Sequence, residues 1–262
     1  MQNTPIILLI GGKGTRLASP SQKKPTLPKS LQKINSKYLL FHAMQNFIDH
    51  GFNNFIFPIG NFKKTYLDFF KSLKKINNKS TNIYKSKKDF LFKLKFNKRQ
   101  ELNLFILKTK INANKAERVY ECVKYLELVN FGVSYGDGVG DINLTKLYNQ
   151  HIKSKCIMSV AAKKPVSQYG IFKFNSNSNV VSDFIEKPTT DYWANIGYFF
   201  FKKNAIKFLI KYKQNDLETG VLRKIARSNL LNVYKHKGFW KSVDTQKDVK
   251  ELSKLIKQNE KE

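Results

Sequence analysis

The chain has 262 residues, of which 41% are hydrophobic and 13% aromatic, and this is enough apolar surface to cover both faces of a sheet within one large domain. Its formal net charge of +29 is typical of proteins that bind nucleic acid, anionic lipid or phosphorylated small molecules. Only five of the 48 basic residues are arginine, whereas base and phosphate recognition favours the planar guanidinium, so the composition argues against nucleic acid as a partner.

The N-terminal residues show no targeting pattern. The apolar run 6–10 follows no basic segment and ends at Gly11, which makes it too short for a signal peptide or a membrane span. We therefore expect a cytoplasmic protein with no membrane partner. Cys122 and Cys156 lie in apolar patterns without a CxxC or Cys/His spacing, which predicts buried thiols and no disulfide or zinc site.

The first half of the chain alternates strand-like and helix-like patterns. Residues 6–10 are a branched apolar run ending in glycine, which is typical of a buried parallel strand. Helical spacing follows over 38–48, a second strand over 54–59, and another helix over 62–73. Residues 74–110 are rich in lysine and asparagine with alternating Phe and Leu, which predicts β hairpins at an edge of the sheet.

The second half continues the same alternation and ends in a helix. The predicted elements are a helix over 118–126, a strand over 131–135, a helix over 144–152, strands over 157–162, 170–174, 180–185 and 195–201, helices near 205–212 and 218–228, a last strand pair before Asp244, and a helix over 246–258. This order predicts a single α/β domain with a Rossmann-like, mostly parallel sheet, helices on both faces and an added β region.

A glycine-rich loop directly follows the first predicted strand, where open α/β sheets bind ligands. Residues 11–17 read GGKGTRL, so bare backbone N–H groups and two cations can approach a phosphate or a base edge. The loop is neither a P-loop, in which lysine follows the last glycine, nor a dinucleotide fingerprint, which would need Gly or Ala in place of Leu17. A tight turn with incidental charge is the alternative.

Lys29 follows this loop in a segment restricted by Pro25 and Pro28. A restricted loop loses less entropy when its lysine meets a ligand. A solvated lysine in a proline turn is the alternative.

These motifs resemble the sugar-1-phosphate nucleotidylyltransferases, in particular the glucose-1-phosphate cytidylyltransferase branch. GGKGTRL followed by a Pro-Lys pair carries the resemblance at the start of the chain. The later motifs occur in the matching order: YGDG at 135–138 with Asp141, YG at 169–170, EKP at 186–188, Asn195 with Gly197 and Phe199, and GFW at 238–240 with Asp244.

The resemblance implies a fold of the nucleotide-diphospho-sugar transferase type, with a nucleotide-binding part over about 1–140, an acceptor-binding part over about 141–245 and a C-terminal helix over 246–258. It implies a transferase that moves NMP, with CMP from CTP favoured, onto a sugar 1-phosphate or related phosphorylated acceptor and releases pyrophosphate. Such an enzyme would make activated precursors for surface polysaccharides. Self-association into a homo-oligomer is left open.

The resemblance also assigns site residues. Asp137 and Asp244 would hold Mg²⁺, the implied cofactor, since a hard cation prefers carboxylate and phosphate oxygens; neither has an obvious basic neighbour, and a turn former is the alternative for Asp137. Arg16 and Lys29 would act on the triphosphate. The nucleotide-binding residues would be Ile10, Gly11, Gly12, Lys13, Gly14, Thr15 and Asp137. The acceptor-binding residues would be Tyr169, Gly170, Glu186, Lys187, Asn195, Gly197 and Glu218, with Lys187 on the acceptor phosphate.

Three segments depart from the cytidylyltransferase pattern. Residues 112–115 read NANK in place of TGGR, Ile196 replaces a glycine, and 217–221 read LETGV in place of WExEP. Because Ile196 would fill space that a sugar ring needs, the acceptor need not be glucose 1-phosphate. A catalytically silent nucleotide-binding relative and a basic nucleic-acid-binding protein are the alternative functions.

Overall fold

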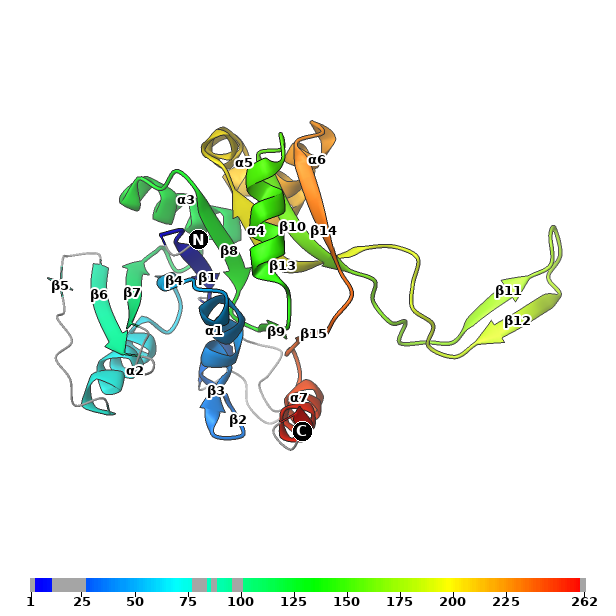
Figure 1. Cartoon of the computed structure of the whole chain (residues 1–262), viewed down its shortest axis with the longest axis horizontal. Coiled ribbons are helices and arrows are strands. Elements are labelled where there is room, and N and C mark those ends of the chain that lie inside the picture. The colour runs from blue at the N-terminus through cyan, green and yellow to red at the C-terminus, as the bar shows by residue number, and fades with distance from the viewer. Residues whose placement is uncertain (1–2, 11–26, 77–83, 86–88, 96–100, 260–262) are drawn as a thin grey trace.

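A mostly parallel sheet forms the centre of the computed structural model, which describes residues 3–10, 27–76, 84–85, 89–95 and 101–259 (Figure 1). Nine strands within these residues form one sheet in the order β14-β10-β13-β8-β1-β4-β7-β6-β5. Its central strands β8 (Phe131–Tyr135), β1 (Ile6–Leu9), β4 (Asn54–Ile59) and β7 (Glu101–Lys108) are parallel to one another. The mostly parallel sheet predicted from the sequence is therefore confirmed.

Antiparallel strands extend this centre on both sides. β13 (Ala194–Phe201) runs antiparallel to β8 and to β10 (Met158–Lys163). At one edge, β6 (Asp89–Lys95) and β5 (Tyr84–Lys85) form the predicted hairpins. At the other edge, β14 (Leu231–His236) lies parallel to β10.

The predicted last strand pair is wrong, because its two strands join different sheets. β14 completes the main sheet, whereas β15 (Trp240–Ser242) pairs antiparallel with β9 (Gly138–Gly140). Local sequence marks both segments as strands, but their partners are set by contacts with distant parts of the chain.

Helices cover both faces of the main sheet. α1 (Leu39–Asp49), α2 (Lys63–Ile76) and α4 (Leu144–Lys153) pack on the face that includes Ile6 and Leu8. The other face, which includes Ile7, is covered by α3 (Lys115–Leu126), α5 (Ile206–Tyr212), the π-helical turn η5 (Leu217–Leu222) and α6 (Arg223–Arg227). Successive strand residues point to opposite faces, so a strand buried on both faces needs the continuous apolar run seen in the sequence.

A third, smaller core holds the C-terminal helix against the N-terminal half of the chain. α7 (Gln246–Asn259) packs beside the small sheet of β2 (Lys33–Ile34) and β3 (Lys37–Tyr38). Ile34, Leu39, Val243 and Leu252 are the buried residues of this contact. It brings the segment just before α7 next to the segment that follows residue 26.

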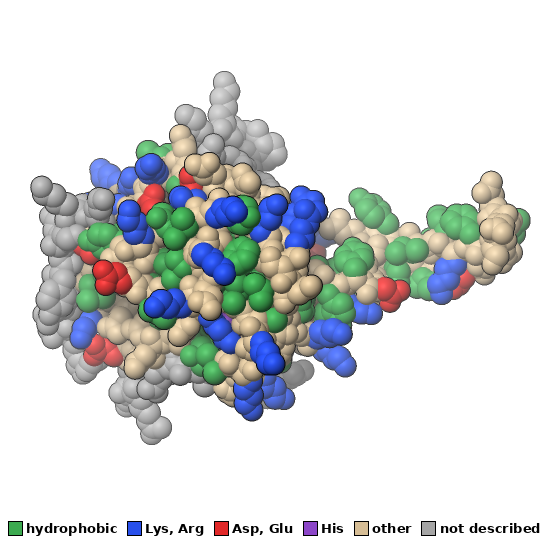
Figure 2. Space-filling model, turned by 90° about the horizontal axis from the view of Figure 1, so that it is seen from above, with side chains coloured by type: hydrophobic (Ala, Val, Ile, Leu, Met, Phe, Trp, Pro, Cys, Tyr) green, Lys and Arg blue, Asp and Glu red, His purple; other side chains and the backbone are tan. Residues whose placement is uncertain are grey.

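A hairpin of β11 (Ile171–Phe174) and β12 (Val181–Ile185) projects from the body (Figure 1). Phe172, Phe174 and Phe184 on it are each more than half exposed, and hydrophobic side chains lie along its surface (Figure 2). On the body in the same view, Lys and Arg side chains are interspersed with other residues. The hairpin corresponds to the added β region predicted from the sequence. Self-association into a homo-oligomer stays a prediction.

No helix within the described residues is long and apolar enough to cross a bilayer. Cys122 and Cys156 are free thiols. Cys122 is fully buried, as predicted, and burial raises the pKa of its thiol. Cys156 is only partly buried, because it lies between α4 and β10 and outside the core.

Tyr66 on α2 connects two segments that flank residues 11–26. Its buried hydroxyl donates to the Ile10 carbonyl at 2.6 Å and accepts from the Ser30 hydroxyl at 2.8 Å. We expect Tyr66→Phe to lower the free energy of unfolding by about 1–3 kcal/mol, because two buried polar groups lose their partner. Urea unfolding followed by circular dichroism measures this change.

Tyr125→Phe is the matched control, because its hydroxyl donates to Asp89 at the exposed surface. We expect its effect to stay within about 0.5 kcal/mol. Equal losses in the two variants would show that Tyr66 does not hold these segments together.

Candidate active site

The Lys29 ammonium lies between two aspartates from distant parts of the chain. Its Nζ donates to Asp137 Oδ2 at 2.7 Å and to Asp244 Oδ1 at 2.8 Å. Lys29 begins the short 3₁₀ helix η2 (Lys29–Leu31), Asp137 lies in the turn between β8 and β9, and Asp244 lies between β15 and α7. Lys29 is 17% exposed and the aspartates 31% and 37%, so a ligand can reach this group.

The small ladder of β9 and β15 places the two aspartates together. Ser242 of β15 pairs with Gly138 of β9, and the Val243 N–H donates to the Asp137 carbonyl at 2.9 Å. Each aspartate follows or precedes its strand by one or two residues. The register of the ladder therefore sets the separation of their carboxylates.

The start of α7 orients Asp244. Ser242 Oγ donates to Asp244 Oδ2 at 2.7 Å, and the Asp244 N–H donates to Asp248 Oδ2 at 3.0 Å. Burial opposes ionisation of Asp248, but hydrogen bonds from Thr245, the Asp244 backbone and Lys241 outweigh it and lower the pKa of this carboxyl. Asp248 is thus a fixed anion that accepts from the backbone at this junction.

The sequence expectation that neither aspartate has a basic neighbour is wrong, because Lys29 pairs with both. It is 108 and 215 residues away from them along the chain, so the contact arises only from the fold. Within the part of the chain that the structure describes, no group of three or more His, Cys, Asp or Glu could hold a metal. Two carboxylates that already share one positive charge nevertheless suit a hard divalent cation whose remaining ligands are water or substrate oxygens.

The predicted glycine loop lies outside the described residues, and with it Gly11, Gly12, Lys13, Gly14, Thr15 and Arg16. Ile10, the last described residue before it, is buried, and its carbonyl accepts from Tyr66. Ser30, next to Lys29, bonds to the same tyrosine hydroxyl. Tyr66 therefore ties the end of β1 to the helix η2 that carries Lys29.

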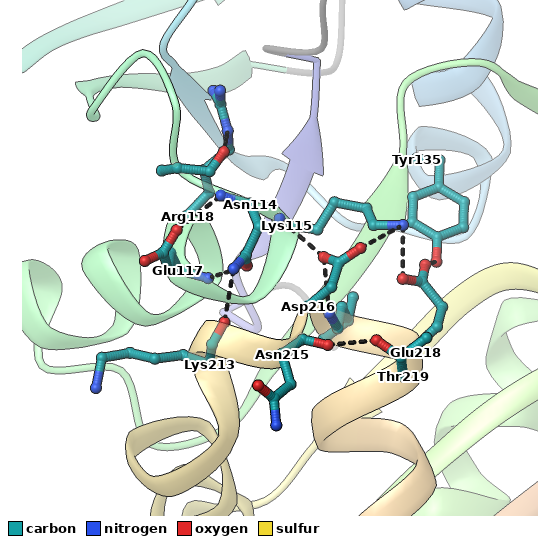
Figure 3. Close-up of polar contacts among 12 residues, drawn as sticks. Asn114, Lys115, Glu117, Arg118, Tyr135, Lys213, Asn215, Asp216, Glu218 and Thr219 are labelled. Carbon is teal, nitrogen blue, oxygen red and sulfur yellow. Dashed lines mark hydrogen bonds and ion pairs between the residues drawn. The ribbon is translucent and has the colours of Figure 1, made fainter.

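Three of the predicted acceptor residues, Glu218, Asn195 and Gly197, lie around Tyr135 at the end of β8; Figure 3 shows Glu218 at the Tyr135 hydroxyl. The Tyr135 hydroxyl donates to Glu218 Oε1. Gly197 has φ +84°, and a Cβ there would lie 2.3 Å from the Tyr135 ring. The Asn195 side chain accepts from the Gly197 N–H at 2.8 Å. Burial raises the pKa of Tyr135, and the bonded Glu218 carboxylate adds to the shift, so the phenol stays a neutral donor.

The Ile196 side chain points into the core and away from the Tyr135 group, and its effect on the acceptor space stays a prediction. Its side chain is 2% exposed and belongs to the core on the face of Ile10, whereas Tyr135 packs against the core on the opposite face. Because neighbouring residues of a strand point to opposite faces, Asn195 and Gly197 face Tyr135 and Ile196 faces away.

The other predicted acceptor residues lie where the projecting hairpin begins and ends. Tyr169 is 77% exposed, and Gly170 packs against the Phe184 ring. Glu186 and Lys187 pair with each other at 3.5 Å and are each 61% exposed. The structure thus places these four residues on the hairpin and does not join them to the Tyr135 group.

Two residues with no predicted role, Lys115 and Asp216, complete the Tyr135 group. Lys115 Nζ lies 2.6 Å from Glu218 Oε2 and 3.3 Å from Asp216 Oδ2. The sequence signal for Asp216 is its place before Leu217, because its side chain accepts from the Leu217 N–H at 2.8 Å as an N-cap does. In the sequence, Lys115 is part of the segment 112–115 that departs from the family pattern, and it carries no predicted role.

The geometry agrees with comparisons to known proteins. A family model described as Nucleotidyl transferase matches residues 5–259. A "probable glucose-1-phosphate cytidylyltransferase" of Bacillus subtilis (strain 168) is 28% identical over 258 residues, which cover 97% of this chain and 96% of the relative. The glucose-1-phosphate cytidylyltransferase of Salmonella typhimurium (strain LT2) is 27% identical over 252 residues, covering 92% and 91%.

Solved structures share the fold at lower sequence identity. UDP-glucose pyrophosphorylase complexed with UDP-glucose gives a TM-score of 0.67 at 20% identity and covers 98% of this chain and 99% of its own. The inositol-1-phosphate CTP transferase from T. maritima gives 0.66 at 14% identity, covering 98% and 96%. These matches confirm the predicted fold type.

Gly197→Ala tests the packing of Tyr135. The left-handed backbone costs a side chain about 1–2 kcal/mol, and crowding against the Tyr135 ring adds about 1–3 kcal/mol. Gly51→Ala is the control, since its φ of +83° carries the same backbone strain. We expect Gly197→Ala to be the more destabilised in urea unfolding; equal losses would mean that the ring does not require a glycine here.

Proposed function

The chain belongs to the nucleotidyl transferase family, and from this premise we propose that it transfers a nucleoside monophosphate, CMP from CTP, to a sugar 1-phosphate or related phosphorylated acceptor. Two relatives named as glucose-1-phosphate cytidylyltransferases, each matched along nearly its whole length, support the choice of base and acceptor. Activated precursors for surface polysaccharides are the products that fit this reaction.

One observation carries the proposal: Asp137 and Asp244 converge on a single cation, the Lys29 ammonium. A purely structural ion pair needs only one carboxylate per lysine. Here the second carboxylate adds repulsion between Asp137 and Asp244, which a structural role does not explain. Two carboxylates beside a lysine are the groups needed to hold a divalent cation and a triphosphate together.

The reaction needs no protein nucleophile. An oxygen of the acceptor phosphate attacks the α-phosphorus of the NTP, the bond from that phosphorus to the bridging oxygen breaks, and the electron pair leaves with pyrophosphate. Mg²⁺, held by Asp137 and Asp244, would neutralise charge on the phosphates. The remaining contribution of the protein is to position both substrates and to supply cations.

Lys29 has one role before the NTP binds and another after it binds. In the structure its ammonium neutralises the two aspartates; with an NTP bound, Lys29 would contact the phosphates, and Asp137 and Asp244 would hold the metal ion. Arg16 and the loop 11–15 are proposed to contact the triphosphate, and Lys187 the acceptor phosphate. Glu218 and Asn195, around Tyr135, are proposed to face the acceptor hydroxyls.

A catalytically silent relative loses part of its support. That alternative depended on the three segments that depart from the family pattern, and one of them, Ile196, turns its side chain into the core. The lysines interspersed over the body surface in Figure 2 are a solvated surface and give no reason to prefer nucleic acid binding.

Pyrophosphate release with each NTP, Mg²⁺ and a panel of sugar phosphates tests the function directly. We expect release with CTP and a sugar 1-phosphate, and a loss of about 10²-fold or more in kcat for Asp137→Asn and for Asp244→Asn. The double variant should be little worse, because the two ligands act as one unit. The control is Asp49→Asn, which removes an exposed carboxylate that accepts from Gln45. Wild-type turnover in Asp244→Asn would refute the proposed metal pair.

Lys29→Met tests the exchange between lysine and metal. We expect this variant to bind Mn²⁺ about tenfold more tightly than wild type in the absence of nucleotide, because the competing ammonium is gone. Electron paramagnetic resonance of free Mn²⁺ measures the affinity without any turnover. Lys93→Met, which breaks an exposed ion pair with Glu101, should leave Mn²⁺ binding unchanged. Weaker binding in Lys29→Met would show that the lysine supports the metal site and does not compete for it.

A further inference from the structure

The departing segment 112–115 contacts the residues just before the departing segment 217–221. Asn114 Nδ2 donates to the Lys213 carbonyl at 2.8 Å, and the Lys115 N–H donates to Asp216 Oδ1 at 3.1 Å. Asn114 also caps α3, since its side chain accepts from the Glu117 N–H. The start of α3, η4 (Lys213–Asn215) and Asp216 therefore form one hydrogen-bonded unit.

Within this unit the Lys115 side chain reaches Glu218. Its Nζ lies 2.6 Å from Glu218 Oε2 and 3.3 Å from Asp216 Oδ2, and 5.7 Å from the centre of the Tyr135 ring. The Asn114 side chain and the Lys115 N–H already join α3 to Lys213 and Asp216, so this contact has bonds that do not involve the Lys115 side chain. The Lys115 ammonium lies against the Glu218 carboxylate and places a positive charge beside it (Figure 3).

Both oxygens of Glu218 have a protein donor, Tyr135 on one and Lys115 on the other. Burial acts to lower the pKa of Lys115, but the hydrogen bonds and charges of Glu218 and Asp216 outweigh it and raise that pKa, so the ammonium stays charged at neutral pH. Each carboxylate oxygen keeps a further lone pair that a hydroxyl can use. Glu218 is 29% exposed and Lys115 41%, which leaves them reachable.

The group and the proposed metal aspartate Asp137 are both carried by the end of β8. Tyr135 ends β8, and Asp137 follows two residues later, at the carboxyl end of parallel strands where open α/β sheets bind ligands. The Lys115 ammonium lies between the carboxylates of Asp216 and Glu218. Without Lys115, these two carboxylates would have no ammonium between them.

We propose that Lys115 is a specificity-determining residue: by pairing with Glu218 and Asp216, it selects an acceptor that presents neutral hydroxyl groups and disfavours one that presents an ammonium. This inference rests on the proposed function and names the acceptor class for the same site. The ammonium of Lys115 occupies the place beside Glu218 that a substrate ammonium would take. A substrate ammonium that approached Glu218 would therefore be repelled by the Lys115 ammonium. Hydroxyl groups can still donate to the free lone pairs of Glu218.

The test compares glucose 1-phosphate with glucosamine 1-phosphate, at a pH at which the amine is protonated, in wild type, Lys115→Met and Lys115→Arg. We expect wild type to favour the neutral sugar. Lys115→Met should raise the ratio of kcat/KM for the amino sugar over that for the neutral sugar by about tenfold, and leave the KM for CTP within about twofold. Lys115→Arg, which keeps the positive charge, should retain the wild-type ratio.

The control variant Lys93→Met also removes an ion-paired lysine, at the edge of the sheet, and should not alter the ratio. A purely structural role for Lys115 would lower both activities equally, and an unchanged ratio in Lys115→Met overturns this inference while the proposed function stands. If wild type releases pyrophosphate with neither sugar, the acceptor class is wrong and this inference falls with it.

Discussion

The contact of the Lys29 ammonium with the carboxylates of Asp137 and Asp244 holds three distant segments of the chain together. Lys29, Asp137 and Asp244 come from three segments that no local signal connects, and their atoms meet at 2.7 and 2.8 Å. The β9–β15 ladder and the small core beneath α7 bring these segments together. Without the ammonium, two carboxylates would face each other, which disfavours the charged form of both; in the proposed function a metal ion would take the place of the ammonium.

The Tyr135 group and the Lys29 contact are connected through strand β8. Tyr135 and Asp137 lie two residues apart at the end of this central strand, so one element fixes both the proposed metal pair and the proposed acceptor pocket. Gly197 lets β13 approach the Tyr135 ring, and the π-helical turn η5 presents Glu218 to its hydroxyl. The proposed metal pair and the proposed acceptor pocket are thereby attached to the same strand.

Local patterns predicted elements well where strands are buried on both faces. The predicted bounds 54–59 and 131–135 are those of β4 and β8, because a doubly buried strand must be continuously apolar. Strand pairing was not predictable in this way, because the last two strands join different sheets. The direction of the Ile196 side chain, which points into the core, was not predicted either. The Lys29 contact joins residues 108 and 215 positions apart, and the Lys115 group joins residues about one hundred positions apart. Resemblance to relatives says nothing about residues that the relatives do not share.

A crystal structure with Mn²⁺ and a non-hydrolysable CTP analogue tests the central claim, the exchange of lysine for metal between the two aspartates. The account predicts an anomalous peak at about 2.0–2.3 Å from one oxygen of Asp137 and one of Asp244, with Lys29 Nζ moved from the aspartates to the phosphates. A peak elsewhere, or Lys29 still bound to both carboxylates with nucleotide and metal present, would contradict it.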